Sequence, residues 1–263
     1  MCRIVVALWL LLAFLPVAQA GRSCEPRALQ VADVERGLEL AQRTVVALDA
    51  SAAHIVILAR AGQDLSDYGL HYSHLGFAYR HSDGHGGHVW RVVHKLNRCG
   101  TAEASIYRQG LAEFFLDRPW RYEAAWVVPS EAVQERLLAR VRDPQQLIHL
   151  HSKPYSIVSY AWSQRYQQSN QWALETLAAA LDSTIDTRAQ AQDWLREHNY
   201  EPSTLHISTL ERLGGRLTAA NVAFDDHPPK KRFSSRIDTV TVDSVFAWMA
   251  KAGLAGTPVR IAK

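Results

Sequence analysis

A hydroxyl at the start of a predicted helix is the first candidate for chemistry in this sequence. Ser169 opens the segment 169–181, and its helical face also carries Trp172, Thr176 and Leu177. The hydroxyl is therefore expected to face the interior. Backbone N–H groups and the positive end of the helix dipole converge there and would stabilise negative charge on an attacked carbonyl. The simpler alternative is that Ser169 is an ordinary N-cap.

Two of the 12 histidines lie on neighbouring predicted strands and face inward. His74 shares its strand face with Gly76 and Ala78, small residues that leave space beside the imidazole. His94 lies on the apolar face of the next strand, together with Val92. The two rings would approach each other if the register of the hairpin allows it. Alternatively, each is a structural histidine that hydrogen-bonds to the backbone.

The elements that must position these residues follow from the periodicity of apolar side chains. Helical spacing predicts helices over residues 32–48, 104–116, 130–142, 169–181, 187–197 and 243–252. Alternating or β-branched runs predict strands over residues 54–60, 72–80, 89–96, 122–128, 155–160 and 237–242. Turn-rich stretches are expected at 214–215 and 227–229. This mixed order favours an α+β fold, an antiparallel sheet packed against helices, in one domain over residues 21–263.

The N-terminus predicts export. Arg3 precedes an apolar run over residues 4–17, and Ala18-Gln19-Ala20 is a small-x-small cleavage pattern, so residues 1–20 are interpreted as a signal peptide. No later stretch is long and apolar enough for a transmembrane segment. Without residues 1–20 the chain has 28 basic and 26 acidic side chains, and such a balance of charge over the whole chain predicts no general electrostatic attraction to nucleic acid or anionic lipid. We expect a periplasmic or secreted protein.

Two cysteines remain after removal of the signal peptide, Cys24 and Cys99. Thiols of an exported chain meet an oxidising compartment, where an even number of them pairs. The sequence therefore predicts a disulfide between Cys24 and Cys99.

Other histidines are weaker candidates. His81, His85 and His88 could bind zinc together with Asp83, but a solvated hairpin loop is the preferred interpretation. The segment 225–227 places acid and imidazole side by side, and we expect a turn there because consecutive side chains rarely face each other. His149 and His151 are expected at the surface. The sequence has no phosphate loop, nucleophile elbow or zinc-protease motif, and neither a metal nor a cofactor is predicted.

Across nearly its whole mature length, the chain resembles a bacterial secreted family known as domain of unknown function 2145. The stretches that carry this resemblance are 62–65 (GQDL), 93–97 (VHKLN), 114–117 (FFLD), 165–172 (RYQQSNQW) and 222–228 (VAFDDHP). This resemblance implies no activity.

The order of His74, His94 and a helix-opening Ser169 also resembles the circularly permuted papain-like enzymes, which include the lecithin:retinol acyltransferase group. The resemblance implies a papain-like permuted arrangement, with Ser169 at the position of the nucleophilic cysteine, His74 as its base and His94 orienting that base. A serine hydroxyl lacks the ready ionisation of a thiol, so attack by Ser169 would depend entirely on proton abstraction by its base.

Three functions follow from these observations. The first is a degenerate papain-like domain that binds a cell-envelope peptide, glycan or lipid, with Asn170, Gln171, Tyr166 and Trp172 lining the ligand site beside Ser169. The second is a serine-dependent amidase, esterase or acyltransferase. The third is a structural periplasmic interaction protein. Further aromatic residues that could line a groove are Trp120, Tyr122 and Trp126.

Overall fold

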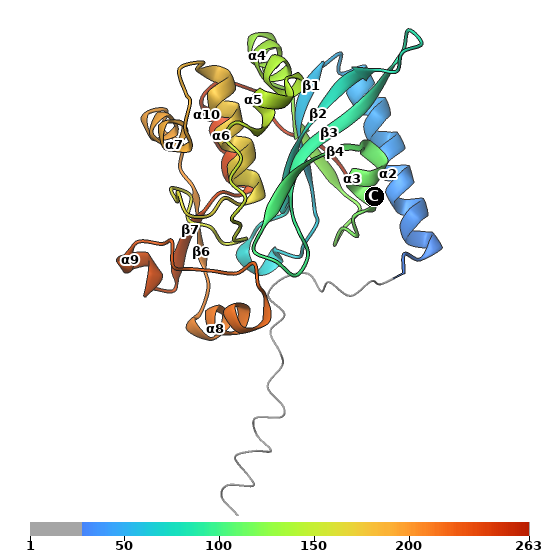
Figure 1. Ribbon diagram of the computed structural model, residues 1–263. Coiled ribbons are helices and arrows are strands. Elements are labelled where there is room, and N and C mark those ends of the chain that lie inside the picture. Colours follow the sequence, from blue (N-terminus) through green and yellow to red (C-terminus); the bar gives the residue numbers. More distant parts are fainter. Residues whose placement is uncertain (1–27, 263) are drawn as a thin grey trace, which may run out of the picture.

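A six-stranded antiparallel sheet forms the centre of the computed structural model, which describes residues 28–262 (Figure 1). Its spatial order is β4-β3-β2-β1-β5-β8. The strands are β1 (Ile55–Arg60), β2 (His74–Ser82), β3 (His88–Asn97), β4 (Ala104–Gly110), β5 (Ala124–Val127) and β8 (Val259–Ile261). Every residue of β1 is buried, because this strand lies in the middle of the sheet and is covered on both faces.

Helices cover both faces of the sheet, as Figure 1 shows. On one face lie α4 (Glu131–Arg142), α6 (Ser169–Leu181) and α10 (Val242–Lys251), with α5 (Pro144–Ile148) and α7 (Arg188–Glu197) packed around them. The opposite face is covered by the long helix α2 (Val31–Ala50) and the short helix α3 (Leu111–Leu116). The fold is α+β with an antiparallel sheet, as predicted from the sequence.

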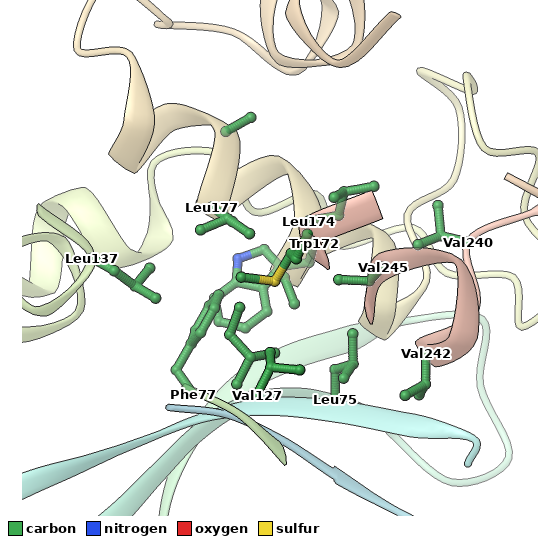
Figure 2. Packing of buried hydrophobic residues seen from close by; sticks show 14 of the residues in the cluster. Leu75, Phe77, Val127, Leu137, Trp172, Leu174, Leu177, Val240, Val242 and Val245 are labelled. Atoms are coloured by element: carbon green, nitrogen blue, oxygen red, sulfur yellow. The ribbon is translucent and has the colours of Figure 1, made fainter. Parts of the chain in front are cut away.

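The larger hydrophobic core lies between the sheet and α6. Trp172 of α6 is completely buried and meets the ring of Phe77 at 5.7 Å between centroids. Figure 2 shows this indole between α6 and the sheet, with Val127 and Leu75 beneath the helix. The second core is formed by α2, α3 and the other face of the same strands.

A smaller unit lies at one end of the molecule (Figure 1). It contains the two-stranded sheet of β6 (Ser203–His206) and β7 (Arg236–Thr239) together with α8 (Thr209–Thr218) and α9 (Pro229–Arg232). Its own small core consists of Ile207, Val222, Phe224 and Ile237. A single 3-10 turn, Ser66–Tyr68, precedes β2.

The structure departs from the predicted elements in three places. Residues 104–116 are not one helix: they form β4 and α3, because the first half pairs along β3, from Asn97↔Ala104 to Arg91↔Gly110. Residues 155–160 form turns and irregular backbone rather than a strand, and their N–H groups bond to unrelated partners: that of Tyr155 to Ala102 O (2.8 Å) and that of Ile157 to Asn221 O (2.9 Å). Residues 214–215, expected in a turn, lie inside α8.

The hairpin loop between β2 and β3 is closed by its own carboxylate. Asp83 accepts hydrogen bonds from the N–H groups of His85 (2.8 Å) and Gly87 (2.9 Å). His88 bonds instead to Asp49 of α2, at 2.8 Å. Within residues 28–262, no group of three or more His, Cys, Asp or Glu side chains is placed to hold a metal ion.

Two predictions concern residues outside the described part of the chain. The proposed signal peptide and Cys24 both lie there, so export and the pairing of Cys24 with Cys99 remain predictions. Among the helices of residues 28–262, none has both the length and the apolar character needed to cross a bilayer.

Candidate functional site

The two histidines singled out by the sequence are hydrogen-bonded to each other. His74 Nε2 lies 2.8 Å from His94 Nδ1, and the rings meet edge to face with centroids 5.1 Å apart. Gly76 permits this approach, since a Cβ built there would lie 3.1 Å from His94 Cβ and 2.8 Å from Val92 Cγ1. The small neighbour noted in the sequence therefore has a steric purpose, namely to let β3 approach β2 closely.

The direction of the hydrogen bonds along this pair can be assigned. His94 Nε2 lies 2.7 Å from Gln109 Oε1 on β4, and an amide oxygen only accepts. Burial, followed by the nearby Arg60 cation, lowers the pKa of His94 to about 4, so the ring is neutral at pH 7 and carries one proton. That proton lies on Nε2, which leaves Nδ1 as the acceptor of a proton carried by His74 Nε2. His74 Nε2 is therefore a donor and not a free base.

A cationic and aromatic frame surrounds the histidine pair. Phe114 of α3 contacts both imidazoles, with centroids 6.0 Å from His74 and 5.1 Å from His94. The guanidinium of Arg60 stacks 4.7 Å from the Phe114 ring and also bonds to the carbonyl of Phe114 and the carboxylate of Asp117. The pair is thus held on the face of the sheet that α2 and α3 cover.

Ser169 occupies the first turn of α6 but is not its N-cap. Gln168 takes that place, and its side-chain oxygen accepts from the N–H of Asn170 at 3.1 Å. Ser169 is buried, as predicted, and its side chain hydrogen-bonds to Tyr155. Burial raises the pKa of Tyr155, and the bond to Ser169 offsets part of that rise. The partner shown for this hydroxyl is therefore a protonated phenol, not an imidazole.

Ser169 and the histidine pair belong to different faces of the sheet. Successive side chains of a strand point to opposite faces: Phe77 contacts Trp172 of α6, whereas His74 contacts Phe114 of α3. In the described part of the chain, the hydrogen bonds of Ser169 and of His74 lead to different partners. Neither of these two bonds is the base-to-hydroxyl contact of roughly 2.6–3.2 Å that nucleophilic attack by serine needs.

The residues expected to line a ligand site beside Ser169 mostly hold neighbouring backbone instead. Asn170 accepts from the N–H of Leu75 (2.9 Å) and donates to the carbonyl of Ser73 (3.2 Å), so it binds β2 on both sides of His74. Gln171 donates to the carbonyl of Ala161 at 3.0 Å.

The two aromatic members of that expected ligand site differ in exposure. Trp172 is a core residue, whereas Tyr166 is half-buried and hydrogen-bonds to Asp225, with Arg165 stacked on its ring at 5.2 Å. Of the four expected ligand-binding residues, Tyr166 is therefore the only one within reach of solvent.

The comparison with known proteins assigns a family. Residues 47–249 match the model of a family described as an uncharacterized protein conserved in bacteria, DUF2145. The chain belongs to the DUF2145 family. No curated protein and no solved structure matches it. The matched span includes the histidine pair, Ser169 and all of α6, so these features lie within the family domain.

The family domain also contains a buried polar network that the sequence analysis missed. Lys95, next to His94 on β3, points to the other face of the sheet and donates to Ser152 O (2.6 Å) and to Gln167 Oε1 (2.7 Å). Burial, with a smaller effect of the Arg188 cation, lowers the pKa of Lys95 to about 6. Strand alternation gave no signal for this burial, because it groups Lys95 with Arg91 on the face of the strand that the sequence marks as polar.

Glu175 is the centre of this network on α6. Its carboxylate accepts from Arg188 Nε (2.8 Å), Gln192 Nε2 (2.7 Å) and Gln167 Nε2 (2.5 Å), and it is almost completely buried. Through these bonds α6, α7 and the segment before α6 are fixed to one another. A carboxylate in the middle of an otherwise apolar helix face was the available signal in the sequence.

Asp226 and His227 contradict the expectation that adjacent side chains do not face each other. Asp226 Oδ1 lies 2.9 Å from His227 Nδ1, and Asp226 Oδ2 accepts from the N–H of Tyr160 at 2.9 Å. Both side chains are buried, and His227 Nε2 has no hydrogen-bond partner among the described residues. The turn before Pro228 folds the carboxylate back on the ring and fixes its orientation.

A groove of about 420 Å³ lies between α2 and the segment 119–123. Trp120 is 55% exposed in its wall, and Tyr122 lies under the guanidinium of Arg36 at 4.8 Å. Arg43 and Arg121 are further cationic residues of this groove, and its carboxylates are Asp33, which pairs with Arg36 at 2.6 Å, Glu39 and Glu123. Segment 119–123 begins two residues after Asp117, whose carboxylate bonds to Arg60 beside the histidine pair. The groove and the histidine pair therefore lie on the same face of the sheet, the face that α2 covers.

Proposed function

We propose that this protein is an exported cell-envelope protein that binds a peptide or glycan without converting it. The observation that carries the proposal is the groove between α2 and the segment 119–123. Its volume falls in the range of roughly 300–1,000 Å³ that is usual for ligand sites. An exposed indole offers an apolar face to a sugar ring or a peptide side chain. The guanidinium groups of Arg43 and Arg121 match carboxylates, and the carboxylates of Glu39 and Glu123 in the same lining match hydroxyl or amino groups of the ligand.

The hydrogen bonds around Ser169 and His74 support binding without turnover. His74 Nε2 donates a hydrogen bond to His94 Nδ1, and the Ser169 hydroxyl is bonded to Tyr155. A serine nucleophile needs a base that removes its proton, and neither of these bonds supplies one. We therefore propose that Ser169, His74 and His94 position β2 and α6, in a site that is degenerate compared with a papain-like enzyme.

The binding half of the proposal is tested with soluble peptidoglycan fragments, which contain both glycan and carboxylate-bearing peptide. We expect calorimetric binding by the mature protein and at least about tenfold weaker binding by Trp120→Ala, because large aromatics commonly dominate the energy of a contact. Tyr107→Ala is the matched control, since Tyr107 is 40% exposed on β4, away from the groove. Equal affinity of the Trp120 variant and the parent would refute the groove as the binding site.

The catalytic alternative is tested separately. A serine-dependent amidase, esterase or acyltransferase would react with a fluorophosphonate probe at Ser169, and Ser169→Ala would lose the label. We expect no labelling of either protein. Labelling that depends on Ser169 would replace the proposed binding function by an enzymatic one.

A further inference from the structure

Helix α8 presents its apolar side to solvent. Leu210 is 80% exposed, Leu213 55% and Leu217 77%. At 100° per residue these three positions fall within about 60° of one another around the helix axis. The opposite side of α8 is the one that packs inward, and it carries Arg212 and Gly215.

The inward side of α8 is fixed by polar contacts, so the outward leucines are not the result of a loosely placed helix. Arg212 donates to the carbonyl oxygens of Ile207 (3.2 Å) and Arg232 (2.8 Å), and its guanidinium stacks 5.0 Å from the ring of Phe224. Ser208 and Glu211 form a capping box at the start of the helix. These contacts determine which face of α8 is exposed.

The same corner of the molecule adds a fourth apolar side chain and several cations. Phe233, directly after α9, is 84% exposed. Arg212, on the side of α8 opposite the leucines, connects the helix to the carbonyl end of α9, so α8 and Phe233 belong to one unit. Exposed cations of this unit are Arg216, Lys230, Arg232 and Arg236. Its exposed carboxylate, Glu211, is engaged in the capping box.

We propose that α8 and the segment after α9 bind the surface of a bilayer that contains anionic phospholipid. Leu210, Leu213 and Leu217 would enter the boundary between head groups and acyl chains, while the exposed cations and Phe233 of the same unit contact the head-group region. A ten-residue helix is too short to span a bilayer, but an amphipathic helix flanked by cations suits the interface.

A bilayer fits this surface better than a protein partner does, chiefly because of its charge. The protruding side chains would bury on the order of a few hundred Å² of this chain, which is at the lower limit of roughly 500 Å² per partner for a stable protein–protein interface. The excess of positive charge also matches a phosphate surface. This proposal does not depend on the groove at Trp120, which lies on a different part of the molecule.

The experiment is co-sedimentation of the mature protein with vesicles of phosphatidylglycerol or of phosphatidylcholine. We expect binding to phosphatidylglycerol that is at least about tenfold stronger than to phosphatidylcholine and that weakens with added salt. The double variant Leu213→Glu/Leu217→Glu should lose at least about tenfold in binding. Val46→Glu is the matched control, because Val46 is 65% exposed on α2, and it should bind within about twofold of the parent.

Three results would overturn the proposal. The first is no binding of the parent to phosphatidylglycerol vesicles, and the second is equal binding by the double leucine variant. The third is a dimer in analytical ultracentrifugation that the double leucine variant abolishes, since the surface would then join two copies of the chain. Circular dichroism of each variant establishes that the comparison is made between folded proteins.

Discussion

Replacement of Gly76 by alanine should destabilise the protein through the close approach of β2 and β3. The added Cβ would lie 2.8 Å from Val92 Cγ1, 3.1 Å from His94 Cβ and 3.2 Å from the carbonyl oxygen of Val93. The last of these is a backbone atom, so a side-chain rotation cannot relieve all three contacts. Overpacking of a well-packed core typically costs about 1–3 kcal/mol.

The same substitution at an open position provides the control. A Cβ on Gly256 meets nothing within 4 Å, and this glycine is exposed. Both substitutions remove similar conformational freedom from the unfolded chain, so the difference between them isolates the steric cost. We expect Gly76→Ala to unfold roughly 4–8 °C below Gly256→Ala, which corresponds to about 2 kcal/mol in a chain of this size.

The assay is thermal unfolding followed by circular dichroism, together with the imidazole ¹⁵N signals of His74 and His94. If the strands are pushed apart, the 2.8 Å contact between the rings lengthens and their ¹⁵N shifts move. Equal unfolding temperatures for the two variants, with unchanged imidazole signals, would show that the steric reasoning about Gly76 is incorrect.

Two further predictions concern buried groups, and a third concerns export and the disulfide. Glu175→Gln should lower the free energy of unfolding in urea by about 3–5 kcal/mol, because it leaves the Arg188 guanidinium buried without its carboxylate. The control Asp193→Asn removes an exposed ion pair with Arg196 and should change this free energy by less than about 0.5 kcal/mol. Equal losses in the two variants would contradict the role given to the buried pair. For His94, the pKa is lowered from 6.5 to about 4 in the folded state, so between these pH values only the unfolded chain takes up the proton. Stability should therefore fall by about 3 kcal/mol as the pH drops from 6.5 to 4, and His94→Gln should show a shallower slope; identical slopes would exclude His94 as the source. Mass spectrometry of the exported protein should find residues 1–20 removed and Cys24 linked to Cys99, and a thiol at Cys99 that reacts with iodoacetamide before reduction would disprove the pairing.

The sequence alone determined the elements that have strong periodicity and the faces that they bury. Residues 169–181 form α6 within the predicted bounds, and the β2–β3 hairpin has the predicted order. Period-2 alternation placed His74 and His94 on one face, and the register brought the two rings into contact. These predictions succeeded because side-chain periodicity reports which face is buried without any knowledge of the partner.

Only the tertiary structure decided what each buried polar group bonds to. Residues 104–110 became a strand because β3 offered an unpaired edge, although their composition also suits a helix. Ser169 points inward as expected, but its partner is Tyr155, and the base expected for it lies across the sheet. Glu175 and Lys95 entered a shared network that joins distant parts of the chain. Local pattern fixes the direction of a side chain, whereas the group it meets depends on how separate elements pack, because hydrogen bonds form only over a few ångströms.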